Sequence, residues 1–141
     1  MDTTVNNLQA RSPEEQVKLE RAERALVAYT TGKQAGPVPR SVWLGDGYVE
    51  IFVFNRRLHL ACVFVMHENR RTGLGSKYLK EVLAIADKHG AEVELSVQPV
   101  GPQDPLTKMG KRDLKAWYKR HGFVALKDRP DRMIRTPVPA Q

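Results

Sequence analysis

The apolar positions in the first part of the chain follow the spacing of an amphipathic helix. Four of them recur at intervals of three or four residues, namely Leu19, Ala22, Leu26 and Tyr29. Just before them, Ser12 suits the N-cap, Pro13 suits the first helical position, and Glu15 completes a capping box. The pattern predicts a helix from Pro13 to near Gly32, after a loose polar tail over residues 1–11.

Three apolar runs follow, separated by short polar segments. They cover residues 42–44, 48–54 and 58–66, with Asp-Gly at 46–47 and Asn-Arg-Arg at 55–57 between them. Such segments are typical of hairpin turns, so we expect three antiparallel strands in a meander. The third run is apolar except for His59. It predicts a strand that is buried on both faces at the centre of a sheet.

The next two patterns predict a helix and a strand that extend this sheet. Residues 73–88 carry apolar side chains at helical spacing, and Gly90 follows as a stop signal. Residues 93–97 form a short apolar strand. A right-handed crossover through the helix would return this strand to the sheet beside the run at 58–66.

The C-terminal part is expected to complete one mixed sheet. A loop rich in Pro and Gly over 98–110 precedes a helix over 112–120 and short strands over 123–126 and 132–135. We therefore predict an α/β fold with an N-terminal helix, an antiparallel meander, a central βαβ unit and a C-terminal helix plus two strands. Residues 1–141 would be a single domain with a second flexible tail at 136–141.

Charge is unevenly distributed along the 141 residues. Of the 23 Lys and Arg residues, ten lie within 106–135 beside only three Asp, so this segment carries the whole formal charge of +7. The excess indicates an anionic partner, either a phosphate-bearing ligand or nucleic acid. A single cysteine, Cys62, excludes a disulfide framework, and the four His show no ligand spacing, so we expect no metal. Without a signal peptide or a membrane-length apolar run, a cytoplasmic protein is expected.

The segment between the buried run and its helix has the chemistry of an anion site. Gly73-Leu74-Gly75 opens the helix, where free backbone N–H groups and the helix dipole favour a phosphate. Tyr78 replaces the last glycine of a dinucleotide-binding fingerprint. Arg112 follows Gly110-Lys111 where a nucleotide-hydrolysing P-loop needs Ser or Thr, so both of those motifs are excluded.

Two segments resemble landmarks of the GNAT superfamily of acyl-CoA-dependent N-acetyltransferases. Arg70-Arg71-Thr72-Gly73-Leu74-Gly75 is similar to its Arg/Gln-x-x-Gly-x-Gly/Ala signature and stands between a central strand and a long helix. Downstream, Trp117-Tyr118 on a short helix running into Gly122-Phe123 resembles the second landmark. The resemblance covers about residues 58–135, and it implies acetyl-CoA as co-substrate.

The resemblance also implies roles for individual residues. The sheet would splay between the strands at 58–66 and 93–97 to admit the acetyl-pantetheine arm, and Tyr118 would protonate the departing thiolate. A tyrosine hydroxyl suits this role because its reference pKa of about 10 lies above that of a thiol. Lys111 stands where many members have an Asn that contacts pantetheine. The cofactor-binding residues would be Val65, Met66, Arg70, Arg71, Thr72, Gly73, Gly75, Ser76 and Lys111.

The general base is left open among five residues: Glu50, His59, Glu68, Glu94 and Asp104. Strand alternation would turn Glu94 toward water, and Cys62 is expected in the core rather than as a nucleophile. The favoured function is acetyl transfer to a primary amine of unidentified structure. A non-catalytic GNAT-fold binding protein is the alternative, and a nucleic-acid-binding module is disfavoured. The oligomeric state stays open, a homodimer included.

Overall fold

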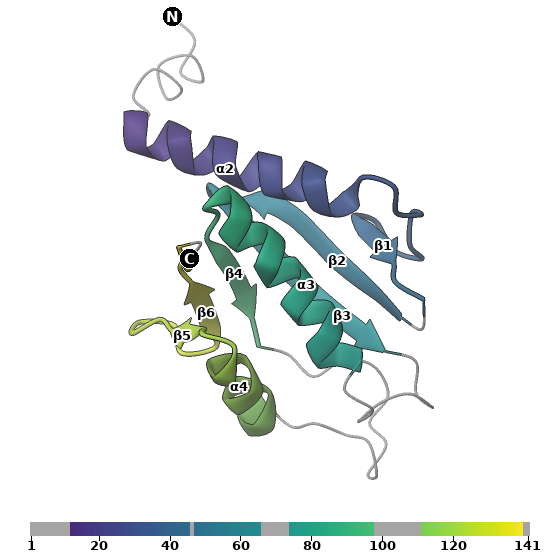
Figure 1. The fold of residues 1–141 in the computed structure, drawn as a ribbon. Coiled ribbons are helices and arrows are strands. Elements are labelled where there is room, and N and C mark those ends of the chain that lie inside the picture. The colour runs from purple at the N-terminus through teal and green to yellow at the C-terminus, as the bar shows by residue number, and fades with distance from the viewer. Residues whose placement is uncertain (1–11, 46, 66–73, 98–110, 140–141) are drawn as a thin grey trace, which may run out of the picture.

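A computed structural model describes residues 12–45, 47–65, 74–97 and 111–139 of the chain (Figure 1). Three helices and six strands lie within these ranges: α2 (Pro13–Thr30), β1 (Ser41–Trp43), β2 (Gly47–Phe54), β3 (Arg57–Val65), α3 (Leu74–His89), β4 (Val93–Ser96), α4 (Lys111–Arg120), β5 (Val124–Ala125) and β6 (Arg132–Arg135). The strands form one mixed sheet in the order β1-β2-β3-β4-β6-β5. This architecture is the predicted α/β fold, and the predicted elements lie within two residues of the observed ones.

The helix boundaries follow from the capping residues in the sequence. The Glu15 N–H donates to Ser12 Oγ at 3.1 Å, so α2 begins with the predicted N-cap. At the other ends, α3 stops before Gly90 and α4 stops before Gly122, and both glycines have positive φ, of 69° and 94°. Glycine adopts this conformation without the penalty of a Cβ, so both helices can end in a tight turn.

The core lies between the sheet and the helices α2 and α3, which share one side of it in Figure 1. Val49 and Ile51 of β2 and Leu58 and Leu60 of β3 point into this core and are buried. The prediction that β3 is buried on both faces is wrong, because Ala61 is exposed and most other residues beyond Leu60 are only half-buried. The second face of β2 and β3 therefore stays partly open to solvent.

The sheet opens between β3 and β4. These parallel strands pair at Leu58↔Val93 and His59↔Glu94, and no further β3–β4 pair occurs among the described residues. In contrast, β2 follows β3 as far as Val65, and β4 pairs with β6 along its whole length. The two strands thus diverge toward their C-terminal ends, as the resemblance implied.

Glu94 is a buried structural carboxylate, and the prediction that it faces water is wrong. Its residue is 4% exposed. Arg57 Nη1 lies 3.0 Å from Glu94 Oε1, and Arg132 Nε lies 2.9 Å from Oε2. Alternation does place Glu94 on the face away from α3, but two guanidinium groups cover it there. This pairing offsets the cost of burying the charge.

A second ion pair fastens β6 to α3. Arg135 Nη1 and Nη2 lie 2.6 and 2.9 Å from the two Asp87 oxygens, and the Val138 N–H donates to the same carboxylate. Burial alone would raise the pKa of Asp87, but the hydrogen bonds from Arg135 and Val138 and the Arg135 charge lower it.

Because the pKa of Asp87 is lowered in the folded state, its contribution to stability is present above the unfolded pKa and is lost as pH falls through the folded value. We expect Asp87→Asn to reduce the free energy of unfolding at neutral pH by about 1 kcal/mol. The variant should also lose less stability than the wild type on acidification below about pH 4. Urea unfolding at several pH values measures both effects, and parallel curves for the two proteins would contradict them.

Candidate functional site

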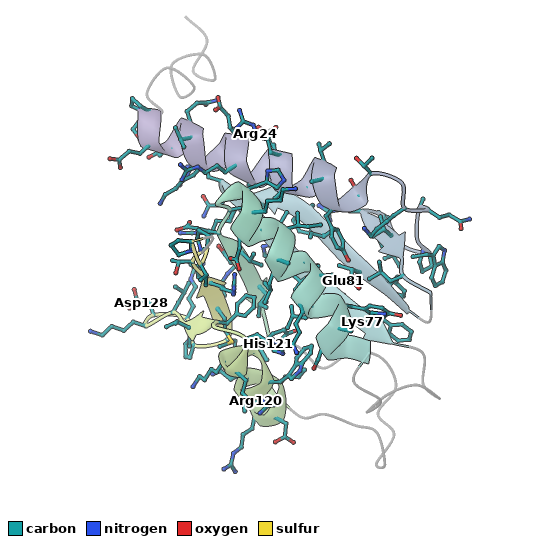
Figure 2. The ribbon with its side chains drawn as sticks, viewed as in Figure 1. Arg24, Lys77, Glu81, Arg120, His121 and Asp128 are labelled. Carbon is teal, nitrogen blue, oxygen red and sulfur yellow. The ribbon has the colours of Figure 1, made fainter. Side chains whose placement is uncertain are left out.

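The beginning of α3 is the described part of the predicted phosphate loop. Gly75 and Ser76 lie in its first turn, where the first N–H groups of a helix have no partner within it. The Trp117 Nε1–H donates to Ser76 Oγ at 2.9 Å and joins α4 to this turn. Figure 2 shows α4, with Arg120 labelled, near the end of α3 that carries Lys77. Nothing in the sequence pattern predicted this contact.

Of the other predicted cofactor-binding residues, the structure describes only Val65 and Lys111. Val65 is the last residue of β3, one residue before the predicted end of this strand, and Lys111 is the first of α4, one residue before the predicted start of this helix. Met66, Arg70, Arg71, Thr72 and Gly73 lie outside the described residues. Glu68 and Asp104 of the candidate bases also lie outside them.

Tyr118 lies on the inner side of α4 among other aromatic rings. Its ring centroid is 4.9 Å from that of Trp117 and 5.6 Å from that of Phe123. Burial, followed by the nearby Cys62, raises the pKa of Tyr118 to about 12. The hydroxyl is therefore protonated at neutral pH and available as a donor.

Cys62 lies opposite Glu50 in the sheet and near Tyr118. It lies beyond the last β3–β4 pair, and its Cα partner in β2 is Glu50. The register shifts next to this pair, because Ile51 is paired with Leu60 and Ala61 is left between them as a bulge. Burial, followed by the Glu50 charge, raises the pKa of Cys62 to about 11, so the thiol is not an activated nucleophile.

The three candidate bases that the structure describes have different surroundings, and they are Glu94, His59 and Glu50. Glu94 is held by two arginines and is not free to take a proton from a substrate. His59 is half-buried, and its Nδ1 has no hydrogen-bond partner among the described residues. Burial lowers the pKa of His59, with Arg132 and Arg40 adding to the effect. Glu50 is half-buried on the open face and has neither an ion pair nor a hydrogen bond within the described ranges.

The basic C-terminal segment is partly neutralised within the fold. Arg132 and Arg135 bind Glu94 and Asp87, and Lys115 Nζ lies 3.7 Å from an Asp131 oxygen. Exposed basic residues on α4 include Arg112, Lys119 and Arg120. Lys127 and Arg129, between β5 and β6, are exposed as well, so the positive charge that is available to an anion lies both on the helix that carries Tyr118 and on this turn.

The described ranges contain neither a candidate metal site nor a candidate membrane-spanning helix. No group of His, Cys, Asp and Glu suited to a metal ion occurs there. Among the helices that the structure describes, none is both long and apolar enough to cross a bilayer.

Comparison with known proteins gives one family match and several similar folds. The model of the acetyltransferase (GNAT) family matches residues 4–123. The anti-CRISPR protein AcrVA5 is 22% identical with a TM-score of 0.53, and the match covers 68% of this chain and 96% of that one. Ard1 from Thermoplasma volcanium is 16% identical (TM-score 0.48; 85% and 93% covered), and a KacTA–DNA complex is 15% identical (0.46; 68% and 65%). A search of curated proteins finds no match.

Proposed function

The chain belongs to the acetyltransferase (GNAT) family, and we propose that it transfers the acetyl group of acetyl-CoA to the nitrogen of a primary amine. Acyl-CoA-dependent acetyl transfer is the general activity of this family. The observation that carries the proposal for this chain is the opening between β3 and β4, with Tyr118 at its side. A thioester placed in this opening would lie within reach of a buried hydroxyl group.

The phosphates of the cofactor would bind at the first turn of α3. Gly75 leaves its backbone uncovered there, and the helix dipole favours the negative charge of a pyrophosphate. The bond from Trp117 to Ser76 fixes α4 against this turn. The residues that bind the phosphates and the residue that acts on the sulfur would therefore keep a constant separation.

Attack on the thioester needs a hydrogen-bond donor for the carbonyl oxygen and a proton donor for the departing sulfur. The bulge at Ala61 interrupts the ladder at the edge of the opening, and a backbone N–H released from such a ladder is a suitable oxyanion donor. Tyr118 would donate to the sulfur as the carbon–sulfur bond breaks.

The difference in pKa between the Tyr118 hydroxyl and the CoA thiol limits how Tyr118 can act as an acid. Full transfer from a hydroxyl with a pKa of about 12 to a thiolate of about 8.5 is uphill by about 5 kcal/mol. We therefore infer that the hydroxyl gives its proton to sulfur while it regains one from the attacking nitrogen. An amine that arrives as an ammonium ion loses two protons overall, of which one ends on the thiol and one reaches solvent.

Replacing Tyr118 by Phe should lower kcat for acetyl transfer by about 100-fold, because a general acid contributes about two to four orders of magnitude. Acetyl-CoA affinity should stay unchanged, since the phosphates bind elsewhere. Thiol release with a panel of primary amines measures kcat, and calorimetry measures the affinity. Tyr29→Phe is the matched control, because the Tyr29 hydroxyl is buried in α2 without a hydrogen-bond partner in the described structure. Equal kcat in the Tyr118 variant and the wild type would remove this residue as the acid.

A further inference from the structure

The open face of β2 and β3 carries a carboxylate between two pairs of stacked rings. Tyr48 stacks on Phe64 with centroids 5.1 Å apart, and Phe52 stacks on His59 with centroids 4.8 Å apart. Glu50 lies between Tyr48 and Phe52 on the same face of β2, since alternate residues of a strand share a face. We call this group the Glu50 cluster.

Glu50 differs from Glu92 and Glu94 in having no ion-pair or hydrogen-bond partner among the residues that the structure describes. Glu94 binds Arg57 and Arg132, and Glu92 lies 2.9 Å from Arg57. No cation or hydrogen-bond donor within the described ranges reaches Glu50, although it is half-buried. Partial burial of an unpaired charge costs stability, and such a cost is typical of functional positions. A cationic ligand would offset this cost for a carboxylate that pairs with none of the described cations.

The rings beside Glu50 also favour a cation. The face of an aromatic ring attracts positive charge. Within the fold itself, the Arg40 guanidinium lies 3.9 Å from the Phe52 ring centroid. At the other end of the cluster, Trp43 is 37% exposed and packs edge-on against Tyr48 at 5.9 Å. His59 and Arg40 already lie against the Phe52 ring, so a positively charged ligand would meet the Tyr48, Phe64 and Trp43 rings. Beside them it would meet a carboxylate that has no ion-pair partner in the described ranges.

The cluster adjoins the proposed acetyl-transfer site. Glu50 is the Cα partner of Cys62, which lies in the part of β3 that has separated from β4. Cys62 is close enough to Tyr118 to influence its hydroxyl, and Glu50 influences Cys62 in the same way. A ligand held by Glu50 would therefore approach the thioester from the open face of the sheet.

We propose that the Glu50 cluster is the acceptor subsite, and that it takes an aliphatic primary amine in its ammonium form. Glu50 binds the ammonium group and accepts its first proton, which then passes to solvent. The neutral nitrogen attacks the thioester carbon, the carbon–sulfur bond breaks, and the second nitrogen proton replaces the one that Tyr118 gives to sulfur. A polyamine and a lysine side chain share this chemistry. The assignment of an acceptor rests on the proposed function, whereas ammonium binding by the cluster does not.

Direct binding tests the cluster without any acetyl transfer. The probe is butyltrimethylammonium, which carries the charge but has no proton to lose, and its neutral tert-butyl isostere is the comparison. Calorimetry on the full chain should show binding of the cation only. Glu50→Gln should weaken it by about 10- to 100-fold, and Tyr48→Leu by about 3- to 10-fold. Glu23→Gln, at an exposed position of α2, is the matched control and should bind as the wild type does.

Kinetics then identify the source of the amine. With acetyl-CoA saturating, spermidine and Nα-acetyl-lysine amide are compared as acceptors, and the one with the lower KM indicates a polyamine or a lysine side chain. Glu50→Gln should raise the KM for that amine by about 10- to 100-fold and leave the KM for acetyl-CoA unchanged. Equal binding of the charged and neutral probes, or an unchanged affinity for the cation in Glu50→Gln, would overturn the proposal. Failure of the wild type to bind acetyl-CoA would overturn the proposed function alone, since the cation would still bind.

Discussion

Gly75→Glu is expected to abolish acetyl-CoA binding while leaving the protein folded. The substitution places a side chain and a negative charge in the first turn of α3, where the pyrophosphate would lie. The affinity should fall by at least about 100-fold, because the carboxylate repels the phosphates and the side chain holds them away from the backbone N–H groups. Stability should not fall, because Glu is a better helix former than Gly and suits the N-terminal end of a helix.

Calorimetric titration with acetyl-CoA measures this effect, and thermal unfolding confirms that the variant is folded. Ala84→Glu is the matched control, since it adds the same side chain to an exposed position in the middle of the same helix. This control should bind acetyl-CoA as the wild type does. If Gly75→Glu also kept its affinity, the first turn of α3 would not be the phosphate site.

Glu94→Ala should have the largest effect on stability. It removes the buried carboxylate that Arg57 and Arg132 share, so that Arg57 keeps only Glu92 and Arg132 loses its partner in the described structure. Removing one member of a buried charge network typically costs about 3–5 kcal/mol. Urea unfolding should show this loss for Glu94→Ala and a change of less than about 0.5 kcal/mol for Glu23→Ala, at an exposed position of α2.

A third variant, Glu94→Gln, tests whether Glu94 is a structural residue. A Glu94→Gln variant keeps the shape of the side chain, so more of the protein stays folded than in Glu94→Ala. Its kcat, corrected for the folded fraction, should equal that of the wild type. A selective loss of kcat in a fully folded Glu94→Gln variant would return Glu94 to the candidates for the general base.

The elements of the fold could be predicted because their signals are local. The start of α2 depends on Ser12 and Glu15, which are three residues apart, and the end of α3 depends on the conformational freedom of Gly90. The burial of β3 could not be predicted in the same way. Its apolar sequence does not reveal that α2 and α3 lie on the same side of the sheet. Leu58 and Leu60 are buried, whereas the other residues of β3 whose burial is described stay partly or fully exposed.

The candidate site was predictable where it follows the order of elements along the chain. Gly75 and Tyr118 were placed correctly at the start of α3 and within α4 because the motifs that contain them lie beside a strand or a glycine. The contacts that give the site its geometry join distant segments. The bond from Trp117 to Ser76 spans 41 residues, and the ion pair from Arg57 to Glu94 spans 37. No pattern within a single element contains that information.

The pairing of Glu50 with Cys62 shows a further limit. Its register depends on the bulge at Ala61, and strict alternation along β3 would place these side chains differently. From the sequence, Glu50 was one of five candidate bases with nothing to separate them. The open face of the sheet and the absence of a partner for its carboxylate in the described structure now distinguish it from Glu94.

Thermal unfolding in the presence of acetyl-CoA tests the central claim most directly. A ligand at 100 times its dissociation constant adds about 2.7 kcal/mol to the free energy of unfolding. For a chain of this size, millimolar acetyl-CoA should therefore raise Tm by about 5–10 °C, whereas a short oligonucleotide should not change it. An unchanged Tm with acetyl-CoA, or a larger rise with the oligonucleotide, would contradict the assignment of this chain as an acetyl-CoA-dependent enzyme.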